Sequence, residues 1–189
     1  MRVPIIALAC FMPAALTLAA CGPSQSSSPS AAATAQGAAS GAAAQSRDYH
    51  AELALVGQPE LAADGKSIIV RVNITNDGPI PFGTQATAVH NVNLGAHSID
   101  AAGKIMDNDL ARGSMPQAAP GATVKATVSL PIDKMLGNRA ELLPVAEGVG
   151  WFDKWGTKPL VVGPFMACSD ASFGRICDAA GIPLTLAQQ

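Results

Sequence analysis

The side chains best suited to gripping a ligand form one short aromatic group late in the chain. Only 4% of the residues are aromatic, yet Trp151, Phe152 and Trp155 lie almost together. Aromatic faces in loops commonly hold sugar rings and peptide side chains, and this group falls between two expected strands. We therefore predict Trp151, Phe152 and Trp155 as binding residues, with Trp155, between Lys154 and Gly156, as the most exposed. The alternative is that Trp151 and Phe152 plug one end of the fold.

Other residues that could do chemistry do not form a recognisable site. His90 and His97 are an odd number of positions apart, so on one strand they face opposite ways and cannot share a metal ion. The run Asp107-Asn108-Asp109 lacks the spacing of an EF-hand loop, so we expect a solvated turn. Glu147 is expected to be a hydrogen-bond partner, because no second carboxylate can be placed at glycosidase spacing. With no GxSxG, GxGxxG, HExxH or CxxC motif, we predict no catalytic residue, metal or cofactor, and no enzyme.

The N-terminal segment has the layout of a secretory signal. Arg2 gives a positive start, and the apolar run from Ile5 to Leu18 is too short to be a spanning helix. The run ends in Leu18-Ala19-Ala20-Cys21-Gly22, which resembles the bacterial lipobox, whose cysteine is acylated and becomes the first residue after cleavage. The resemblance implies a lipoprotein signal peptide over 1–20 and a membrane anchor on Cys21.

The segment that follows predicts a flexible tether. Residues 22–46 are small or polar, with no charged or aromatic residue, so they cannot offset the entropy of ordering. We therefore expect an acylated cysteine and linker over 21–46. In the Gram-negative lipoproteins that the lipobox resembles, an aspartate after the acylated cysteine signals retention in the inner membrane. Gly22 stands at that position here, so the resemblance implies the outer membrane, facing the periplasm.

The charge of the chain argues against nucleic acid as a partner. There are 12 basic and 14 acidic residues, giving a formal net charge of −2. The basic residues are scattered and form no stripe that could displace counterions. The expected partners are therefore the membrane, through the lipid anchor, and an envelope glycan or protein.

Two cysteines remain once the leader is accounted for. Cys10 leaves with the signal and Cys21 carries lipid, so Cys168 and Cys177 face an oxidising compartment. We expect them to form a disulfide, the alternative being two free buried thiols. A helix capped by Ser169, with Phe173, Ile176, Cys177 and Ala180 on one face, competes with this bridge. Nine residues of straight helix would hold the cysteines about 13.5 Å apart, whereas a disulfide needs Cα atoms within about 7 Å. We therefore predict the bridge with at most a short helical stretch.

The body of the chain, residues 47–165, follows a period of two. Ile68, Val70, Val72 and Ile74 are expected to point inward and Arg71, Asn73 and Thr75 outward. The apolar residues of 122–130 alternate with polar ones in the same way, which is typical of half-buried strands. Similar short patterns, separated by turn or loop segments such as 113–121, lie at 49–55, 89–99, 104–106, 139–147 and 160–162. About seven short strands predict a single antiparallel sandwich of the all-β class. A short disulfide-tied tail over 166–189 follows it.

Several stretches resemble a known family. They are Leu94-Gly95-Ala96-His97-Ser98-Ile99-Asp100-Ala101-Ala102-Gly103-Lys104, Ala111-Arg112, Met115-Pro116, Ala119-Pro120-Gly121 and Glu147-Gly148-Val149-Gly150-Trp151-Phe152. Together they resemble the immunoglobulin-like sandwich appended to bacterial glycosyltransferases and methyltransferases, and to the polysaccharide-binding end of O-antigen ABC transporter subunits. The resemblance covers 68–162 and implies a recognition or spacer domain. The chain departs from it at Ala96, Ser98 and Asn138, where such domains place inward aromatic residues, and at Pro144, within a strand.

The sequence therefore predicts a membrane-anchored envelope lipoprotein. Its immunoglobulin-like domain is expected to bind a glycan or protein component of the envelope without catalysis. An alternative is a structural or assembly subunit of an envelope complex. A third hypothesis is a hydrolase with an unrecognised site.

Overall fold

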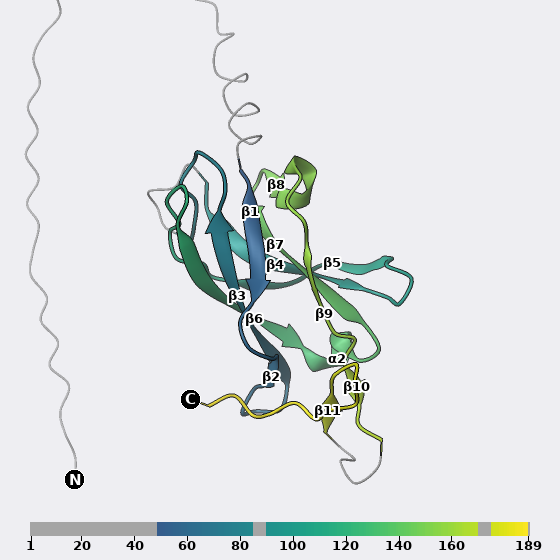
Figure 1. Ribbon diagram of the computed structural model, residues 1–189. Helices are drawn as coiled ribbons and strands as arrows, with labels where there is room; N and C mark the ends of the chain where they lie inside the picture. The colour runs from purple at the N-terminus through teal and green to yellow at the C-terminus, as the bar shows by residue number, and fades with distance from the viewer. Residues whose placement is uncertain (1–48, 85–89, 170–174, 189) are drawn as a thin grey trace, which may run out of the picture. The chain divides into compact units, whose positions relative to one another are not determined.

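The computed structural model describes residues 49–84, 90–169 and 175–188, and these form an all-β fold of antiparallel sheets (Figure 1). In the first sheet β3 (Ser67–Asn76) pairs with β6 (Thr123–Pro131) on one side. On its other side lie β1 (Ala51–Leu55) and β2 (Glu60–Leu61), which pair with successive parts of β3. β1 and β2 thus occupy one edge position that is interrupted at 56–59.

The second sheet has the order β5, β4, β7 and then β8 or β9. Its strands are β4 (Val92–Ile99), β5 (Ile105–Gly113), β7 (Arg139–Ala146), β8 (Gly150–Trp151) and β9 (Leu160–Val162). Two short helices, α2 (Ile132–Met135) and the 3₁₀ helix η2 (Phe152–Trp155), connect strands. β8 and β9 pair with different parts of β7, so they too are one interrupted edge position. With each interrupted edge counted once, the strands β1 to β9 form the predicted seven-stranded immunoglobulin-like sandwich.

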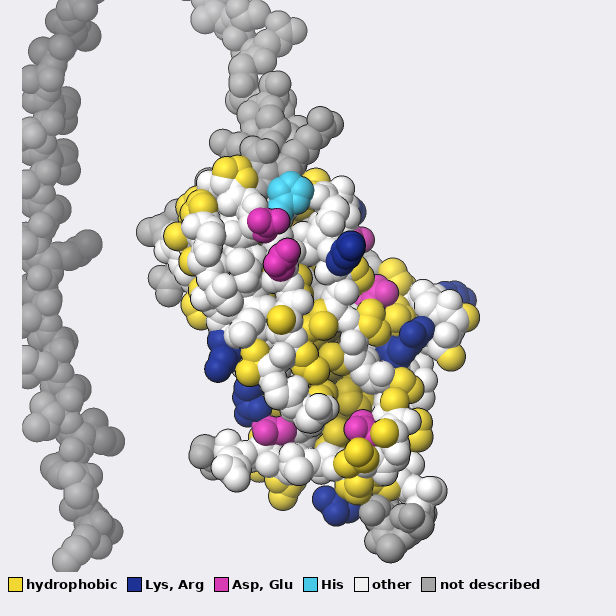
Figure 2. Space-filling view, in the orientation of Figure 1, with side chains coloured by type: hydrophobic (Ala, Val, Ile, Leu, Met, Phe, Trp, Pro, Cys, Tyr) yellow, Lys and Arg dark blue, Asp and Glu magenta, His cyan; other side chains and the backbone are white. Residues whose placement is uncertain are grey.

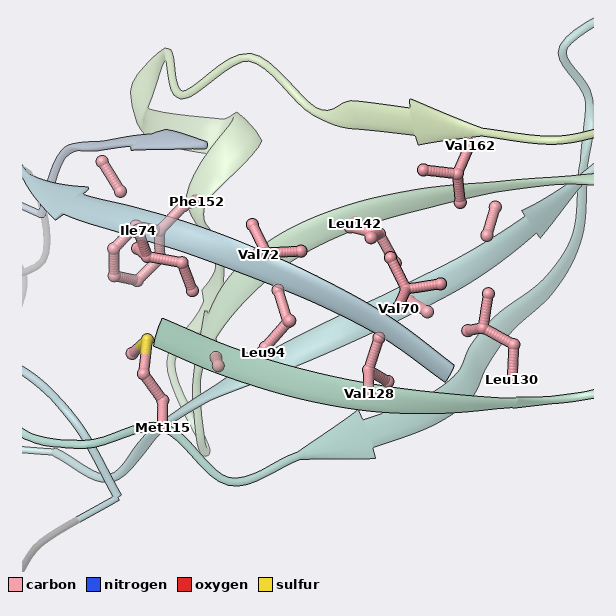
Figure 3. Close-up of a cluster of buried hydrophobic side chains, with 14 of the residues drawn as sticks. Val70, Val72, Ile74, Leu94, Met115, Val128, Leu130, Leu142, Phe152 and Val162 are labelled. Atoms are coloured by element: carbon pink, nitrogen blue, oxygen red, sulfur yellow. The ribbon is translucent and has the colours of Figure 1, made fainter. Parts of the chain in front are cut away.

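The core lies between the two sheets. Ile68, Val70, Val72 and Ile74 of β3 are all completely buried, as their spacing of two residues predicts. Figure 3 shows the β3 and β6 side chains, Val128 among them, pointing toward apolar side chains of β4 and β7. The predicted inward face is therefore confirmed for the clearest strands.

The C-terminal tail is tied by the predicted disulfide. Cys168 and Cys177 are bonded, with Cα atoms 5.2 Å apart, and the bridge closes a hairpin of β10 (Met166–Ala167) and β11 (Ile176–Cys177). Cys177 lies in a strand, and a helical stretch at 170–174 falls outside the described residues. Leu184 is 6% exposed and belongs to the core, so the tail packs on the sandwich.

The structure corrects the expectation of an acidic turn at 107–109 and of only a short strand at 104–106. Residues 105–109 belong to β5, which continues to Gly113. As the outermost strand of its sheet, β5 shows no regular apolar alternation, and register shifts near Ser98 make its pairing with β4 irregular. Gly113 ends the strand where a Cβ atom would overlap the Thr127 carbonyl oxygen of β6. Its missing side chain lets the two sheets meet closely there.

Candidate functional site

Trp151 lies on the outer face of the second sheet. It is paired with Val145 across β8 and β7, and its ring lies where a side chain of Gly95 would otherwise stand. The ring centroids of Trp151 and His97 are 3.8 Å apart, and the Arg112 guanidinium carbon lies 4.4 Å from the centroid of the indole. His97 and Arg112 both lie against the indole ring, so the ring does not present an open platform to a ligand.

Arg112 is held by carboxylates on two sides. Its Nη1 atom lies 2.6 Å from Oδ1 of Asp109, and its Nε atom lies 3.4 Å from Oε1 of Glu147. The Asn93 amide donates to the same Glu147 oxygen at 2.8 Å. Glu147 is thus the hydrogen-bond partner that the sequence predicts. Since exposed ion pairs contribute at most about 1 kcal/mol, the network mainly orients Arg112 over Trp151.

His90 and His97 lie in different parts of the fold. His97 is 4% exposed, and its Nδ1 atom lies 2.7 Å from the Asn108 carbonyl oxygen, so Nδ1 must carry a proton to donate. His90 lies near the Tyr49 ring, with centroids 6.5 Å apart. Among the described residues no group of three or more potential metal ligands is found.

Phe152 and Trp155 belong to an aromatic cluster at one end of the core. The Phe152 ring stacks on Tyr49 at 5.3 Å and meets Phe82 edge-on at 5.4 Å. Trp155 lies 6.0 Å from Tyr49 and 5.6 Å from Phe152. Phe152 has no exposed surface, and Trp155 is partly buried against the core. The three predicted binding residues are thus divided between the outer sheet face, where Trp151 lies, and the core.

Tyr49 is the buried centre of this cluster. Its hydroxyl has no hydrogen-bond partner among the described residues, and burial raises the pKa of this hydroxyl above its usual value of 10.0. An ionised tyrosine could not be accommodated there without cost, because the surroundings are apolar. The cluster therefore closes the end of the sandwich, and the Tyr49 hydroxyl is neutral at neutral pH.

A groove runs between β1 and β9, the edge strands of the two different sheets. The two strands lie side by side and run in the same direction (Figure 1). One half of the groove has a volume of about 420 Å³ and lies between residues 50–53 and 156–160. The other half, of about 280 Å³, lies between Leu55 with its following loop and residues 161–163. We call the two together the β1–β9 groove.

The walls of the β1–β9 groove combine apolar side chains with free strand edges. Leu55 is 37% exposed and Val161 is 43% exposed, and both line the second half. Figure 2 shows hydrophobic side chains gathered in the middle of this face, with charged side chains around them. The Ala51 N–H donates to the Thr157 hydroxyl oxygen at 3.2 Å, which joins the walls at the first half.

The groove was not predicted from the sequence. The alternation of residues 49–55 identifies a strand and its inward face, but it does not identify the neighbours of that strand. From the sequence alone, Leu55 and Val161 are therefore indistinguishable from other strand residues. The one signal in the sequence is that both are large apolar residues close to a glycine, Gly57 or Gly163, where a strand can end.

Comparison with known proteins yields no match to a family model, a curated protein or a solved structure. Cys21 and the apolar leader lie outside the described residues. Within the part of the chain that the structure describes, no helix is both long and apolar enough to cross a membrane. The candidate site therefore depends on the geometry of the sandwich.

Proposed function

We propose that this chain is an envelope lipoprotein whose sandwich binds a protein partner without catalysis. The Leu18–Cys21 pattern supports an acyl anchor on Cys21, and Gly22 favours the periplasmic face of the outer membrane. The resemblance of 68–162 to accessory sandwiches supports a recognition role.

The β1–β9 groove is the observation that carries the choice of a protein partner. Its walls offer two exposed apolar side chains, Leu55 and Val161, beside the unpaired edge of β1. Exposed apolar side chains in a groove suit a protein partner, whose own apolar side chains can be buried against them. A sugar would instead require an accessible aromatic face, and the rings of Trp151, Phe152 and Trp155 are engaged by their own neighbours.

The proposal is tested by crosslinking from the groove in the native membrane. A photoreactive amino acid replaces Val161 in the full-length lipoprotein, and in a second strain it replaces Met106. Met106 is the matched control because it is 59% exposed and lies in β5, on the opposite edge of the second sheet. We expect a discrete protein adduct from position 161 and none from position 106.

The adduct should also depend on the chemistry of the groove. Leu55→Glu places a charge on its apolar wall, so it should abolish the adduct while leaving the melting temperature nearly unchanged. An adduct that survives purification as a stoichiometric complex would identify an assembly subunit. Equal adducts from positions 161 and 106, or saturable binding of envelope polysaccharide that is lost in Trp151→Ala, would contradict the proposal.

A further inference from the structure

We infer that the second half of the β1–β9 groove receives a lysine or arginine side chain of the protein partner, with its carbon stem on the apolar wall and its charged head at Asp178. This inference rests on the proposed function, because it names the chemistry by which the partner would be held. Long cationic side chains bury their stems against apolar surface and keep the charged group at its edge.

The second half of the groove is a pocket with three walls. Leu55, Gln58 and Pro59 form one wall at the end of β1, and residues 161–163 form the second at the end of β9. Residues 178–180 of the C-terminal tail form the third. Its volume of about 280 Å³ lies below the roughly 300–1,000 Å³ of pockets that hold whole small molecules, so it suits a single side chain of a larger partner.

Asp178 is the single charged residue among the described residues that line this pocket. It is partly buried, and the other walls contain the exposed apolar side chains of Leu55 and Val161. An apolar side chain that filled the pocket would cover the carboxylate without pairing it, and an unpaired buried charge is costly. A cationic side chain pairs with the carboxylate while its methylene groups cover the apolar wall. The pocket therefore favours lysine or arginine over an apolar or an acidic side chain.

The C-terminal tail fixes the position of Asp178. The disulfide of Cys177, its neighbour in the chain, closes the β10–β11 hairpin on one side. On the other side, Leu184 packs in the core and its N–H donates to the Ile176 carbonyl. A group that is held in place before binding loses less conformational freedom when the partner arrives. The disulfide-tied tail thus holds the carboxylate ready for the partner.

The turn that carries Asp178 uses one of the two carboxylate oxygens. Oδ1 accepts hydrogen bonds from the Ala180 and Ile182 N–H groups, each at 2.9 Å. Within the described part of the chain, no hydrogen bond to Oδ2 is found. An asparagine could form the same turn with its own side-chain oxygen, so the turn does not require the negative charge. The second oxygen and the charge are therefore free to meet a partner.

Asp100 provides a matched carboxylate outside the groove. The segments 100–104 and 178–182 both begin with Asp-Ala-Ala-Gly. Oδ1 of Asp100 accepts hydrogen bonds from the N–H groups two and four residues later, each at 2.9 Å, as Oδ1 of Asp178 does. Asp100 lines neither half of the groove. Asp178→Asn and Asp100→Asn thus remove the same charge from the same kind of turn, one inside the pocket and one outside it.

The test uses the acylated full-length mature protein in a neutral detergent and two short fluorescent peptides. The first peptide has a lysine between two leucines, with a glycine at each end. The second carries norleucine in place of the lysine, which keeps the four-carbon stem and lacks the ammonium group. Binding is followed by anisotropy at low salt.

We expect the parent protein to bind the lysine peptide at least about fivefold more tightly than the norleucine peptide, as one partly buried ion pair implies. This preference should persist in Asp100→Asn and disappear in Asp178→Asn. Equal binding of the two peptides to the parent protein would overturn the inference without any variant. A preference that persists in Asp178→Asn would overturn it as well.

The adduct formed in native membranes separates this inference from the proposed function. Asp178→Asn should weaken the adduct from position 161, whereas Asp100→Asn should leave it unchanged. An adduct that is equally strong in Asp178→Asn would overturn the inference while the proposed function stands. A lysine preference in detergent without any adduct from position 161 would count against the proposed function alone. An adduct that mass spectrometry identifies as a second copy of this chain would overturn the assignment of the pocket to another protein.

Discussion

Gly95 provides a direct test of how the outer face of the second sheet is packed. A Cβ atom added at Gly95 would overlap Cζ3 and Cη2 of Trp151 and lie 2.9 Å from Nη1 of Arg112. Gly95 is not among the glycines with positive φ, so an alanine there would meet a lack of space rather than a backbone restriction. The Arg112 head group can swing away, whereas the indole must leave its place beside His97.

The expected magnitude follows from two opposing terms. Overpacking of this kind costs about 1–3 kcal/mol, and alanine recovers about 0.5–1 kcal/mol of the entropy that glycine loses on folding. Gly95→Ala should therefore lower the free energy of unfolding by about 0.5–2 kcal/mol. In a Trp151→Ala background the obstacle is absent, so the same substitution should stabilise by about 0.5–1 kcal/mol. The sign of the effect reverses between the two backgrounds.

Urea unfolding of the four variants, followed by circular dichroism, gives this double-mutant cycle directly. The coupling energy between positions 95 and 151 should be about 1–3 kcal/mol, in the range for residues in contact. Circular dichroism is used because one of the two tryptophans is removed in half of the variants. An equal cost of Gly95→Ala in both backgrounds would refute the contact between Gly95 and the indole.

Val128 is 1% exposed, so Val128→Asp should abolish cooperative thermal unfolding by burying an unpaired carboxylate, and an unchanged melting curve would refute the inward assignment. Because the pKa of Tyr49 is raised in the folded state, the contribution of this tyrosine to the free energy of unfolding is fully present below about pH 10 and is lost as the pH rises through the folded-state pKa. The Tyr49→Phe variant should therefore lose less stability than the parent when unfolding is measured at increasing alkaline pH. Replacing both Cys168 and Cys177 with serine should cost about 2–3 kcal/mol of unfolding free energy, and reductant should have no further effect on that variant. Cys21→Ser should leave an uncleaved, unacylated precursor by mass spectrometry, and a normal lipid-modified product would contradict the anchor.

The sequence predicts an element well when the two-residue period of its apolar side chains matches the face that the fold buries. Along β3, each second residue from Ile68 to Ile74 is apolar and completely buried, since a strand that packs on a second sheet must bury one of its faces. The disulfide was predictable because two cysteines remain near each other in the tail after the leader is set aside. β5 was predicted poorly because an edge strand need not alternate, so Asp107 and Asp109 resembled a turn.

The aromatic group shows what local rules leave undecided. Trp151 and Phe152 are adjacent, so a strand must turn them to opposite faces, and the sequence does not state which one enters the core. Trp155 follows within η2, and this 3₁₀ turn brings its ring back to Tyr49. The distance in sequence between Tyr49 and Trp155 is what made this contact unpredictable.

Pro144 explains why the last edge of the second sheet is interrupted. The Glu147 N–H donates to the Asn91 carbonyl, and this pair continues the unbroken register of β7 with β4. By the alternation of an antiparallel ladder, Pro144 turns its nitrogen toward the opposite edge, where β8 and β9 pair. Proline has no N–H to offer there, so the ladder has a missing donor at that position.

The chain leaves the sheet at this missing donor. β8 pairs with β7 down to Val145, and β9 resumes the pairing at Leu142. The whole of 152–159 therefore stands opposite only Leu143 and Pro144, and it must loop outward. That loop supplies both the Phe152 ring that closes the core and the Thr157 hydroxyl that meets β1. Pro144 thus determines where the sandwich edge opens, and the opened edge forms one wall of the β1–β9 groove.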